Sequence, residues 1–336
     1  MRSRLRIAFP LLSLGSFGGV RKIVEIANGL VDFGHEVSLL YPEGRGSTPF
    51  RIRNEVRRIT VPGKNRLLAL LRYAFAVDKY DVVVLNFWPT AYLFPFTRRS
   101  VYFVQDVESR FHSNPLLRLM ASATYRFPIP KVTYNPALAR VVGARYVIPA
   151  GVDKGVFYPE PDPSLKPRKR LTVMYMPRKE RRKGAHIFRE AVERIKGCCP
   201  FEVWLVGGPE NLLRDLPVPV RRFYPEGDDD LRRLYSSADL FVLTSESEGL
   251  GFPVMEALAC GTPVVATDVD GKEVWALPGV KVVEVSPEAV ASGMEEVLGS
   301  IDVWKGWAKN GRGGIPDVSD MVGSFHNALI THFSTL

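Results

Sequence analysis

The strongest constraint on the fold is an alternation of short β-branched runs with segments of helical periodicity, repeated along all 336 residues. In parallel α/β domains each strand is a short apolar run and each crossover is an amphipathic helix. The strands expected in the first half are Leu5–Phe9, Glu36–Leu40, Asp81–Phe87, Ser100–Val104, Lys131–Tyr134 and Arg145–Ile148. Those expected in the second half are Leu171–Met176, Phe201–Val206, Asp239–Leu243, Pro263–Ala266 and Lys281–Val285. The sequence therefore predicts an α/β protein with two doubly wound, Rossmann-like domains.

The stretch between the two series has a different composition. Residues 159–170 hold four prolines and several charges and have no periodicity, which is typical of a linker. We therefore expect an N-terminal domain over residues 1–160 and a second domain over residues 161–316. The closing segment Asp317–Phe333 has apolar residues at helical spacing and predicts an amphipathic helix.

The formal charge of +9 is unevenly spread. Residues 1–160 hold 23 Lys+Arg against 11 Asp+Glu, whereas residues 161–336 hold 22 against 25. A basic first half favours contact with an anionic membrane or a lipid diphosphate, although a solvated basic surface is the alternative. Nucleic acid is not expected, because no recognition motif interleaves the basic residues with aromatics.

Targeting signals and cysteines point to one compartment. No apolar run approaches the roughly 20 residues that span a bilayer, and the N-terminus lacks the pattern of a signal peptide. The three cysteines form no C-x-x-C pair, so neither a disulfide framework nor a zinc site is expected. We expect a cytoplasmic protein, with peripheral membrane contact through its basic half.

The stretch Thr244–Ala266 carries the clearest chemical signal. A strand ends near Leu243, a polar loop with Gly249 and Gly251 follows, and Pro253 stands at a plausible first helical position. Glycines let the backbone approach a ligand closely, and the free N–H groups of a following helix attract anions. A diphosphate is the natural occupant, and an ordinary tight turn is the alternative.

Two carboxylates flank this turn, Glu248 in the loop and Glu256 in what we expect to be the first helical turn. A carboxylate in the loop can accept hydrogen bonds from sugar hydroxyls, and one on the helix can reach the cis-diol of a ribose. The alternatives are solvent exposure for Glu248 and favourable interaction with the helix dipole for Glu256.

The phrase from Glu248 to Ala266 resembles the Glu-x7-Glu motif of retaining glycosyltransferase family 4. The resemblance implies the GT-B fold, two Rossmann-like domains facing across a cleft, with the C-terminal helix (residues 317–336) returning to the first domain. It implies that Glu248 contacts the donor sugar and that Glu256 contacts the ribose. It also implies that backbone N–H groups around Gly251, Phe252 and Pro253 hold the sugar and phosphates, with Gly249 in the same loop.

A basic loop, Met176–Gly184, is similar to the family's diphosphate clamp. The resemblance assigns Arg178 and Lys183 to the clamp, while Arg181 or Arg182 are alternatives for the arginine. Cations there would stabilise the negative charge that grows on the leaving nucleotide.

Two glycine turns are similar to other family phrases. Gly207, in Val206–Pro209, resembles a donor-binding turn, although the second glycine of the family pattern is displaced here. Gly18 and Gly19, in Ser16–Val20, resemble the loop by which the first domain faces the donor phosphates.

One family feature is missing. Many members carry a histidine near the donor sugar where this chain has Gln105 and Asp106. A similar Gln-Asp phrase is found in a rhamnosyltransferase-like branch of the family, so we expect Gln105 or Asp106 to take over the polar role. His112 is a less favoured substitute, and His35 matches a structural histidine.

The resemblance implies transfer of a hexose or deoxyhexose from a UDP-, GDP- or dTDP-sugar to a glycan, glycolipid or other hydroxyl acceptor, after the cleft closes. The nucleotide-sugar is a co-substrate, and no cofactor or metal is expected because the cationic clamp neutralises the diphosphate. Asp228–Asp230 and Asp268–Asp270 look like the metal-binding D-x-D of another glycosyltransferase fold, but we interpret both as loop acids. The alternatives are a nucleotide-sugar 2-epimerase of the same fold and a non-catalytic nucleotide-sugar-binding protein.

Overall fold

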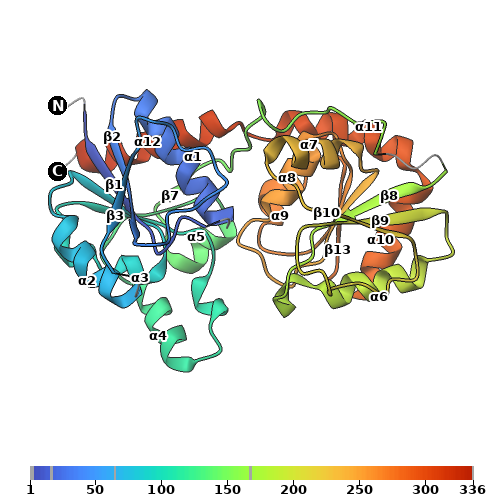
Figure 1. Ribbon diagram of the computed structural model, residues 1–336, viewed down its shortest axis with the longest axis horizontal. Coiled ribbons are helices and arrows are strands. Elements are labelled where there is room, and N and C mark those ends of the chain that lie inside the picture. Colours follow the sequence, from blue (N-terminus) through green and yellow to red (C-terminus); the bar gives the residue numbers. More distant parts are fainter. Residues whose placement is uncertain (1–3, 16–17, 64–65, 166–168, 335–336) are drawn as a thin grey trace. The chain divides into compact units, whose positions relative to one another are not determined.

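The computed structural model describes residues 4–15, 18–63, 66–165 and 169–334. The chain forms two compact units, one made of Met1–Ala150 with Val318–Leu336 and the other of Gly151–Asp317. Each unit is built around a parallel sheet of its own, with helices packed against it (Figure 1). Among the described residues, no helix is both long enough and apolar enough to cross a membrane.

The described residues of the N-terminal unit form a seven-stranded parallel sheet in the order β3-β2-β1-β4-β5-β6-β7. The central strand β4 is buried over its whole length, and β1 and β5 are buried except at their first residues, as expected for a sheet that helices cover on both faces. The strands are β1 (Arg6–Pro10), β2 (Glu36–Pro42), β3 (Arg57–Val61), β4 (Val82–Leu85), β5 (Ser100–Phe103), β6 (Lys131–Thr133) and β7 (Tyr146–Val147).

Helices pack against both faces of this sheet. On one face, α12 returns from the end of the chain and packs on α1, as expected for the C-terminal helix, and its Phe325 contacts Phe103 of β5 with ring centroids 5.6 Å apart. The opposite face carries a core in which Tyr73 and Leu93 pack with strand residues such as Val83. The helices are α1 (Gly18–Asp32), α2 (Arg66–Ala76), α3 (Trp88–Ala91), η1 (Phe94–Phe96), η2 (Glu108–Phe111), α4 (Pro115–Thr124), α5 (Pro136–Val142) and α12 (Val318–Ser334).

The described residues of the C-terminal unit repeat this plan with a six-stranded parallel sheet in the order β10-β9-β8-β11-β12-β13. The strands are β8 (Leu171–Tyr175), β9 (Phe201–Val206), β10 (Val220–Phe223), β11 (Leu240–Leu243), β12 (Val264–Thr267) and β13 (Val280–Val283). The helices are η3 (Arg181–Lys183), α6 (Ala185–Ile195), α7 (Asp228–Ser237), α8 (Phe252–Ala259), α9 (Lys272–Trp275), α10 (Pro287–Gly299), α11 (Ile301–Gly311) and η4 (Arg312–Gly314). Both sheets therefore have the strand order of a doubly wound fold, and in each the order reverses beside the first strand.

Two strands were missed by the sequence pattern, β3 and β10. Each lies at the edge of its sheet and occupies the same place in the strand order of its unit. β3 is largely exposed and β10 is half-buried throughout, so neither needs the apolar run that marks a central strand. Both carry adjacent arginines, which keep an exposed sheet edge from pairing with another chain.

The division between the units falls at Gly151, earlier than the border near residue 160 that the composition indicates. The reason is that residues 152–162 make contacts within the C-terminal unit. Val152 forms a β-bridge with Asp317, and the backbone N–H groups of Glu160 and Asp162 donate to the hydroxyls of Ser236 and Ser237 at 3.0 and 2.8 Å. The first part of the linker-like stretch is therefore docked on α7.

Candidate functional site

The most informative place in the C-terminal unit is the carboxyl edge of its sheet between β8 and β11. The strand order reverses there, and ligands of open α/β sheets bind in the crevice that this reversal leaves. Two loops begin at this edge: residues 176–184 follow β8, and residues 244–251 follow β11. These are the basic loop and the glycine-bearing loop that the sequence singled out.

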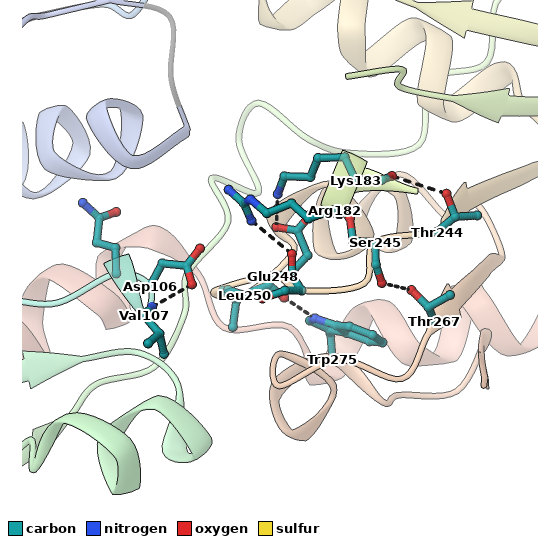
Figure 2. Close-up of polar contacts among 12 residues, drawn as sticks. Asp106, Val107, Arg182, Lys183, Thr244, Ser245, Glu248, Leu250, Thr267 and Trp275 are labelled. Atoms are coloured by element: carbon teal, nitrogen blue, oxygen red, sulfur yellow. Dashed lines mark hydrogen bonds and ion pairs between the residues drawn. The ribbon is translucent and has the colours of Figure 1, made fainter. Parts of the chain in front are cut away.

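The two loops meet through an ion pair. The Lys183 ammonium lies 2.7 Å from Oε2 of Glu248, and both side chains are mostly buried, with 19% and 15% exposed. The other carboxylate oxygen, Oε1, accepts a hydrogen bond from the buried hydroxyl of Ser245 at 2.7 Å. Figure 2 shows Lys183 and Glu248 directed toward each other from their separate loops. The structure thus brings together a cation and a carboxylate that lie 65 positions apart in the sequence.

Backbone contacts fix the positions of both side chains. The N–H of Glu246 donates to the carbonyl of Arg182 at 2.7 Å, and the Thr244 hydroxyl donates to the carbonyl of Gly184 at 2.8 Å. The buried Tyr175 hydroxyl donates to the carbonyl of Lys183 at 3.1 Å. The loops are thus joined by one main-chain hydrogen bond and by side-chain hydroxyls that donate to main-chain carbonyls.

Gly184→Ala should destabilise the folded protein, because Gly184 packs directly against the backbone of the other loop. Its φ is +70°, and an added Cβ would lie 1.7 Å from the carbonyl oxygen of Thr244. We expect a loss of at least about 3 kcal/mol in the free energy of unfolding, measured by urea denaturation. The matched change Gly197→Ala meets no atom within 4 Å and should cost less than about 1 kcal/mol. A similar cost for both variants would contradict the close approach.

A glycine with positive φ starts α8 beside the ion pair. Gly251 has φ +85° and caps the helix, whose first residue is Phe252, so Pro253 is the second helical residue rather than the first. The loop before it is supported by buried side chains: the Trp275 indole donates to the carbonyl of Leu250, and the Thr267 hydroxyl donates to the carbonyl of Ser245 at 2.6 Å (Figure 2). Gly249 lies within this supported loop.

Glu256 lies one turn further along α8 than expected. The first turn of α8 contains no acidic residue, because the helix begins at Phe252 and Glu256 is its fifth residue. The Glu256 side chain is buried, and its Oε2 accepts from the hydroxyl of Tyr235 at 3.3 Å. The hydroxyl of Tyr235 therefore helps to position this carboxylate.

The structure separates the three arginines considered for the clamp. The Arg182 guanidinium donates to the carbonyl of Ser247 at 3.1 Å and so braces the loop. Arg178 is exposed, and its Nη1 lies 3.9 Å from where a Cβ on Gly207 would stand. Gly207 itself has φ +65°. Arg178 and Gly207, both assigned to the donor by resemblance, are therefore neighbours, whereas Arg181 is exposed on η3.

In the N-terminal unit, Gln105 contacts the first turn of α1. Its Nε2 donates to the carbonyl of Gly19 at 3.2 Å, and its Oε1 accepts from the hydroxyl of Tyr134 at 3.3 Å. Asp106 accepts from the N–H of Val107 at 2.7 Å. Gly18 opens α1 and is exposed, while Ser16 and Phe17 of the same phrase lie outside the described residues. Gln105 therefore contacts the first turn of α1, and a direct role for Gln105 or Asp106 at a substrate stays a prediction.

The two histidines considered from the sequence make structural contacts. His112 accepts at Nε2 from the Trp88 indole at 3.0 Å. His35 is buried and accepts at Nδ1 from the N–H of Leu5 at 3.2 Å, and burial lowers its pKa. Neither imidazole is available as a general base in this arrangement.

Sequence reasoning missed Glu108, a fully buried carboxyl close to Asp106. Its Oε2 accepts from the N–H of Trp88 at 2.6 Å and from the hydroxyl of Tyr102 at 3.1 Å. Burial raises the pKa of Glu108 to about 8, with a smaller rise from the Asp106 charge, against the opposing effect of these two hydrogen bonds. A single acid next to a polar phrase gives no sign of burial, so no sequence signal identified it.

Glu108→Gln should remove a pH dependence of stability. The carboxyl holds its proton up to about pH 8 in the folded chain, whereas an unfolded glutamate loses it near pH 4.3. Between these values the folded state binds more protons, so stability falls as pH rises, by up to about 1.4 kcal/mol per pH unit. Urea titrations from pH 5 to 8 should show this slope in wild type and a flatter one in Glu108→Gln. Equal slopes would mean that Glu108 is ionised in the folded protein.

The acidic clusters have other partners. Asp229 pairs with Arg232 at 2.8 Å, Asp268 pairs with Lys272 at 2.5 Å, and Asp230 accepts from the N–H of Glu226 at 3.1 Å. Across the described ranges, no three His, Cys, Asp or Glu side chains gather as a metal site requires.

Part of the C-terminal unit also matches a known protein family. Residues 170–300, which include Lys183 and Glu248, match the model of the family described as "Glycosyl transferases group 1". Residues 170–300 therefore form a group 1 glycosyl transferase domain. The chain is also 32% identical over 168 residues to a lipopolysaccharide core biosynthesis glycosyltransferase of Rhizobium meliloti, covering 47% of each chain. It thus spans about half the length of this curated relative.

Solved structures confirm the fold of the whole chain. The chain is similar to a sucrose-phosphate synthase from Thermosynechococcus elongatus, with a TM-score of 0.84 and 18% identity over 99% of this chain and all of that one. Anabaena HepE in complex with UDP-glucose has a TM-score of 0.76 and 18% identity over 97% of this chain and all of that chain. The expected GT-B fold is confirmed.

Proposed function

We propose that this chain is a retaining glycosyltransferase that moves a sugar from a nucleotide-diphospho-sugar to the hydroxyl of a glycan or glycolipid. The observation that carries the proposal is the Lys183–Glu248 pair at the strand-order reversal of the group 1 domain. A cation, a carboxylate and the start of a helix at one sheet edge suit a ligand that carries both phosphates and sugar hydroxyls.

Donor binding would exchange partners within this pair. The diphosphate is more negative than one carboxylate, so it would take the Lys183 ammonium, and Arg178 beside Gly207 would add a second cation. Glu248 would then be released to accept hydrogen bonds from the sugar. Gly249, Gly251, Phe252 and Pro253 would supply backbone contacts, and Glu256 would reach the ribose.

In the transfer step, the acceptor oxygen would bond to the anomeric carbon on the same face from which the diphosphate leaves. The bond between that carbon and the diphosphate oxygen breaks, and the departing phosphate oxygen takes the acceptor proton. Lys183 and Arg178 would stabilise the developing charge without a metal. Asp106 would orient the acceptor, while Gln105 would hold the start of α1 at Gly19.

A thermal-shift panel of UDP-, GDP- and dTDP-sugars, each with EDTA and with Mg²⁺, tests the proposal. HepE is described with UDP-glucose, so UDP-sugars come first. One donor should raise the melting temperature of the protein equally with and without metal. NMR of its transfer product should show the same anomeric configuration as the donor sugar. Conversion of the donor to its epimer without an acceptor would identify an epimerase. Donor binding without transfer or hydrolysis would identify a binding protein, and no stabilisation by any nucleotide would refute the proposal.

The compartment is part of the same proposal. We infer a cytoplasmic location, where nucleotide-sugars are made, and cell fractionation followed by immunodetection tests it. Recovery outside the cytoplasmic and membrane-associated fractions would contradict it.

A further inference from the structure

The N-terminal unit exposes an unusual amount of apolar side chain on one helix layer. Of the 15 large hydrophobic residues exposed in the described part of the chain, eight lie between Leu68 and Leu119, about a sixth of the sequence. The exposed fractions are 87% for Phe75, 67% for Leu119, 63% for Leu116 and 60% for Leu71. Scattered single residues need no explanation, but this concentration does.

Helix α2 shows the anomaly most clearly. Its inner face buries Ala69 and Tyr73 completely, whereas Leu68, Leu71 and Phe75 follow each other at helical spacing on the outer face. A helix that is apolar on all sides is normally buried on all sides. Something outside the described chain is therefore expected to cover the outer face of α2.

The exposed residues share one face of the unit. Tyr73 of α2 and Leu93, just before η1, belong to one core under the same side of the sheet. The Tyr92 hydroxyl donates to the carbonyl of Met120 at 3.0 Å, which ties this layer to α4. In Figure 1, α2, α3 and α4 follow one another along one side of the N-terminal unit. We define the basic apolar surface as the outward side chains of α2, η1, η2 and α4.

Charge indicates what covers the basic apolar surface. Residues 62–126 hold nine Lys+Arg and four Asp+Glu, and two of those acids are neutralised, Asp81 by its ion pair with Arg6 and Glu108 by burial. Arg72 and Arg118 are exposed among the apolar residues of α2 and α4. The N-terminal unit as a whole has 22 Lys+Arg against 10 Asp+Glu, while the C-terminal unit has 23 Lys+Arg against 26 Asp+Glu.

We propose that the basic apolar surface docks on an anionic lipid bilayer, with its leucines and phenylalanines entering the interface and its arginines contacting lipid phosphates. Amphipathic helices bind membranes by this combination of apolar burial and charge attraction. A nucleic acid would gain nothing from the exposed leucines. A second copy of the chain would bring like charges together across a two-fold axis. The docking is independent of the transfer reaction.

Co-sedimentation of the full chain with vesicles tests the apolar contribution. The vesicles contain one part phosphatidylglycerol to two parts phosphatidylcholine, and pure phosphatidylcholine serves as the uncharged comparison. Leu71→Ser with Phe75→Ser should weaken binding to anionic vesicles at least about tenfold, since about 0.8 kcal/mol is lost for each CH₂ no longer buried. Val285→Ser with Val303→Ser changes two exposed residues of the other unit and should leave binding unchanged.

The charge contribution has its own variants. Arg72→Gln with Arg118→Gln should also weaken binding at least about tenfold, because each basic residue near an anionic surface contributes about a fivefold gain. Arg189→Gln with Lys309→Gln removes two exposed charges from the other unit and should change little. Every variant should keep the wild-type melting temperature and the wild-type donor shift, so loss of vesicle binding cannot be attributed to unfolding or to a damaged donor site.

Several outcomes would overturn the docking proposal. These are absence of wild-type binding to anionic vesicles, equal binding to uncharged vesicles, and equal binding by the surface variants and their controls. Wild-type binding to a single-stranded oligonucleotide, or dimerisation in light scattering, with no binding to vesicles would assign the surface to another partner.

Discussion

Lys183→Ala should lower kcat/KM for the preferred donor by about 10²–10³-fold, the usual cost of removing one preorganised group that stabilises developing charge. The Lys183 ammonium is mostly buried, 2.7 Å from Glu248, on a backbone that Tyr175 and Thr244 hold in place. Its removal leaves the departing diphosphate without its nearest cation. Initial rates of sugar transfer measure the effect.

Lys272→Ala is the matched control for this change. Lys272 also pairs with a carboxylate, that of Asp268, within the same unit, but its side chain is 43% exposed and lies on α9. We expect kcat/KM within about twofold of wild type for this variant, because exposed pairs contribute little. If Lys183→Ala kept wild-type turnover, the clamp assignment would be wrong and the site would need another cation.

The sheet core was predictable because central parallel strands need continuous apolar runs. β4 and β11 are buried along their whole length, and their β-branched and aliphatic residues form apolar runs that identify them in the sequence. β3 and β10 lie at sheet edges, where half-exposed arginines are tolerated, so periodicity could not reveal them. These edge strands are defined by their backbone hydrogen bonds to β2 and β9, and an apolar pattern does not show such bonds.

The residues of the candidate site were predictable as types but not as pairs. The phrase around Glu248 and the basic loop around Lys183 each showed a signal, but their 2.7 Å contact depends on β8 and β11 being neighbours in the sheet. The choice among the arginines stays a prediction: the Arg182 guanidinium donates to the carbonyl of Ser247, whereas Arg178 is exposed beside Gly207. A charge run does not show which contacts each of its members makes.

Contacts across the fold were the hardest to predict. The role of Gln105 in place of a missing histidine stays a prediction, and the structure adds that its amide is hydrogen-bonded to Gly19 and Tyr134. Glu108 gave no signal, although burial raises the pKa of its carboxyl to about 8. Both depend on contacts across the fold, and a single sequence contains no record of those contacts.

Glu248→Gln should separate the two roles that the ion pair implies, because binding and turnover should change in opposite directions. The amide keeps the size of the side chain and an oxygen that can accept from Ser245. It removes the negative charge that occupies Lys183 in the absence of donor. We therefore expect UDP, or the matching nucleoside diphosphate, to bind about three- to tenfold more tightly in calorimetry, in line with about 1 kcal/mol for a partly exposed pair.

Turnover should fall in the same variant. A neutral amide accepts hydrogen bonds from sugar hydroxyls more weakly than a carboxylate, so kcat should drop by about 10²–10³-fold. Glu246→Gln removes the same charge two residues away, where the carboxylate is more exposed and pairs with His186 at 3.3 Å. That control should leave nucleotide affinity and kcat within about twofold of wild type.

A purely structural role for Glu248 predicts a different pattern. If the carboxylate only braced the loop, its loss would loosen the Lys183 side chain, and nucleotide affinity and kcat would fall together. Tighter nucleotide binding with slower transfer requires that Glu248 compete with the diphosphate for Lys183 and then act on the sugar once displaced. The sign of the affinity change therefore decides between a loop brace and a ligand-exchange site, and calorimetry reads that sign directly.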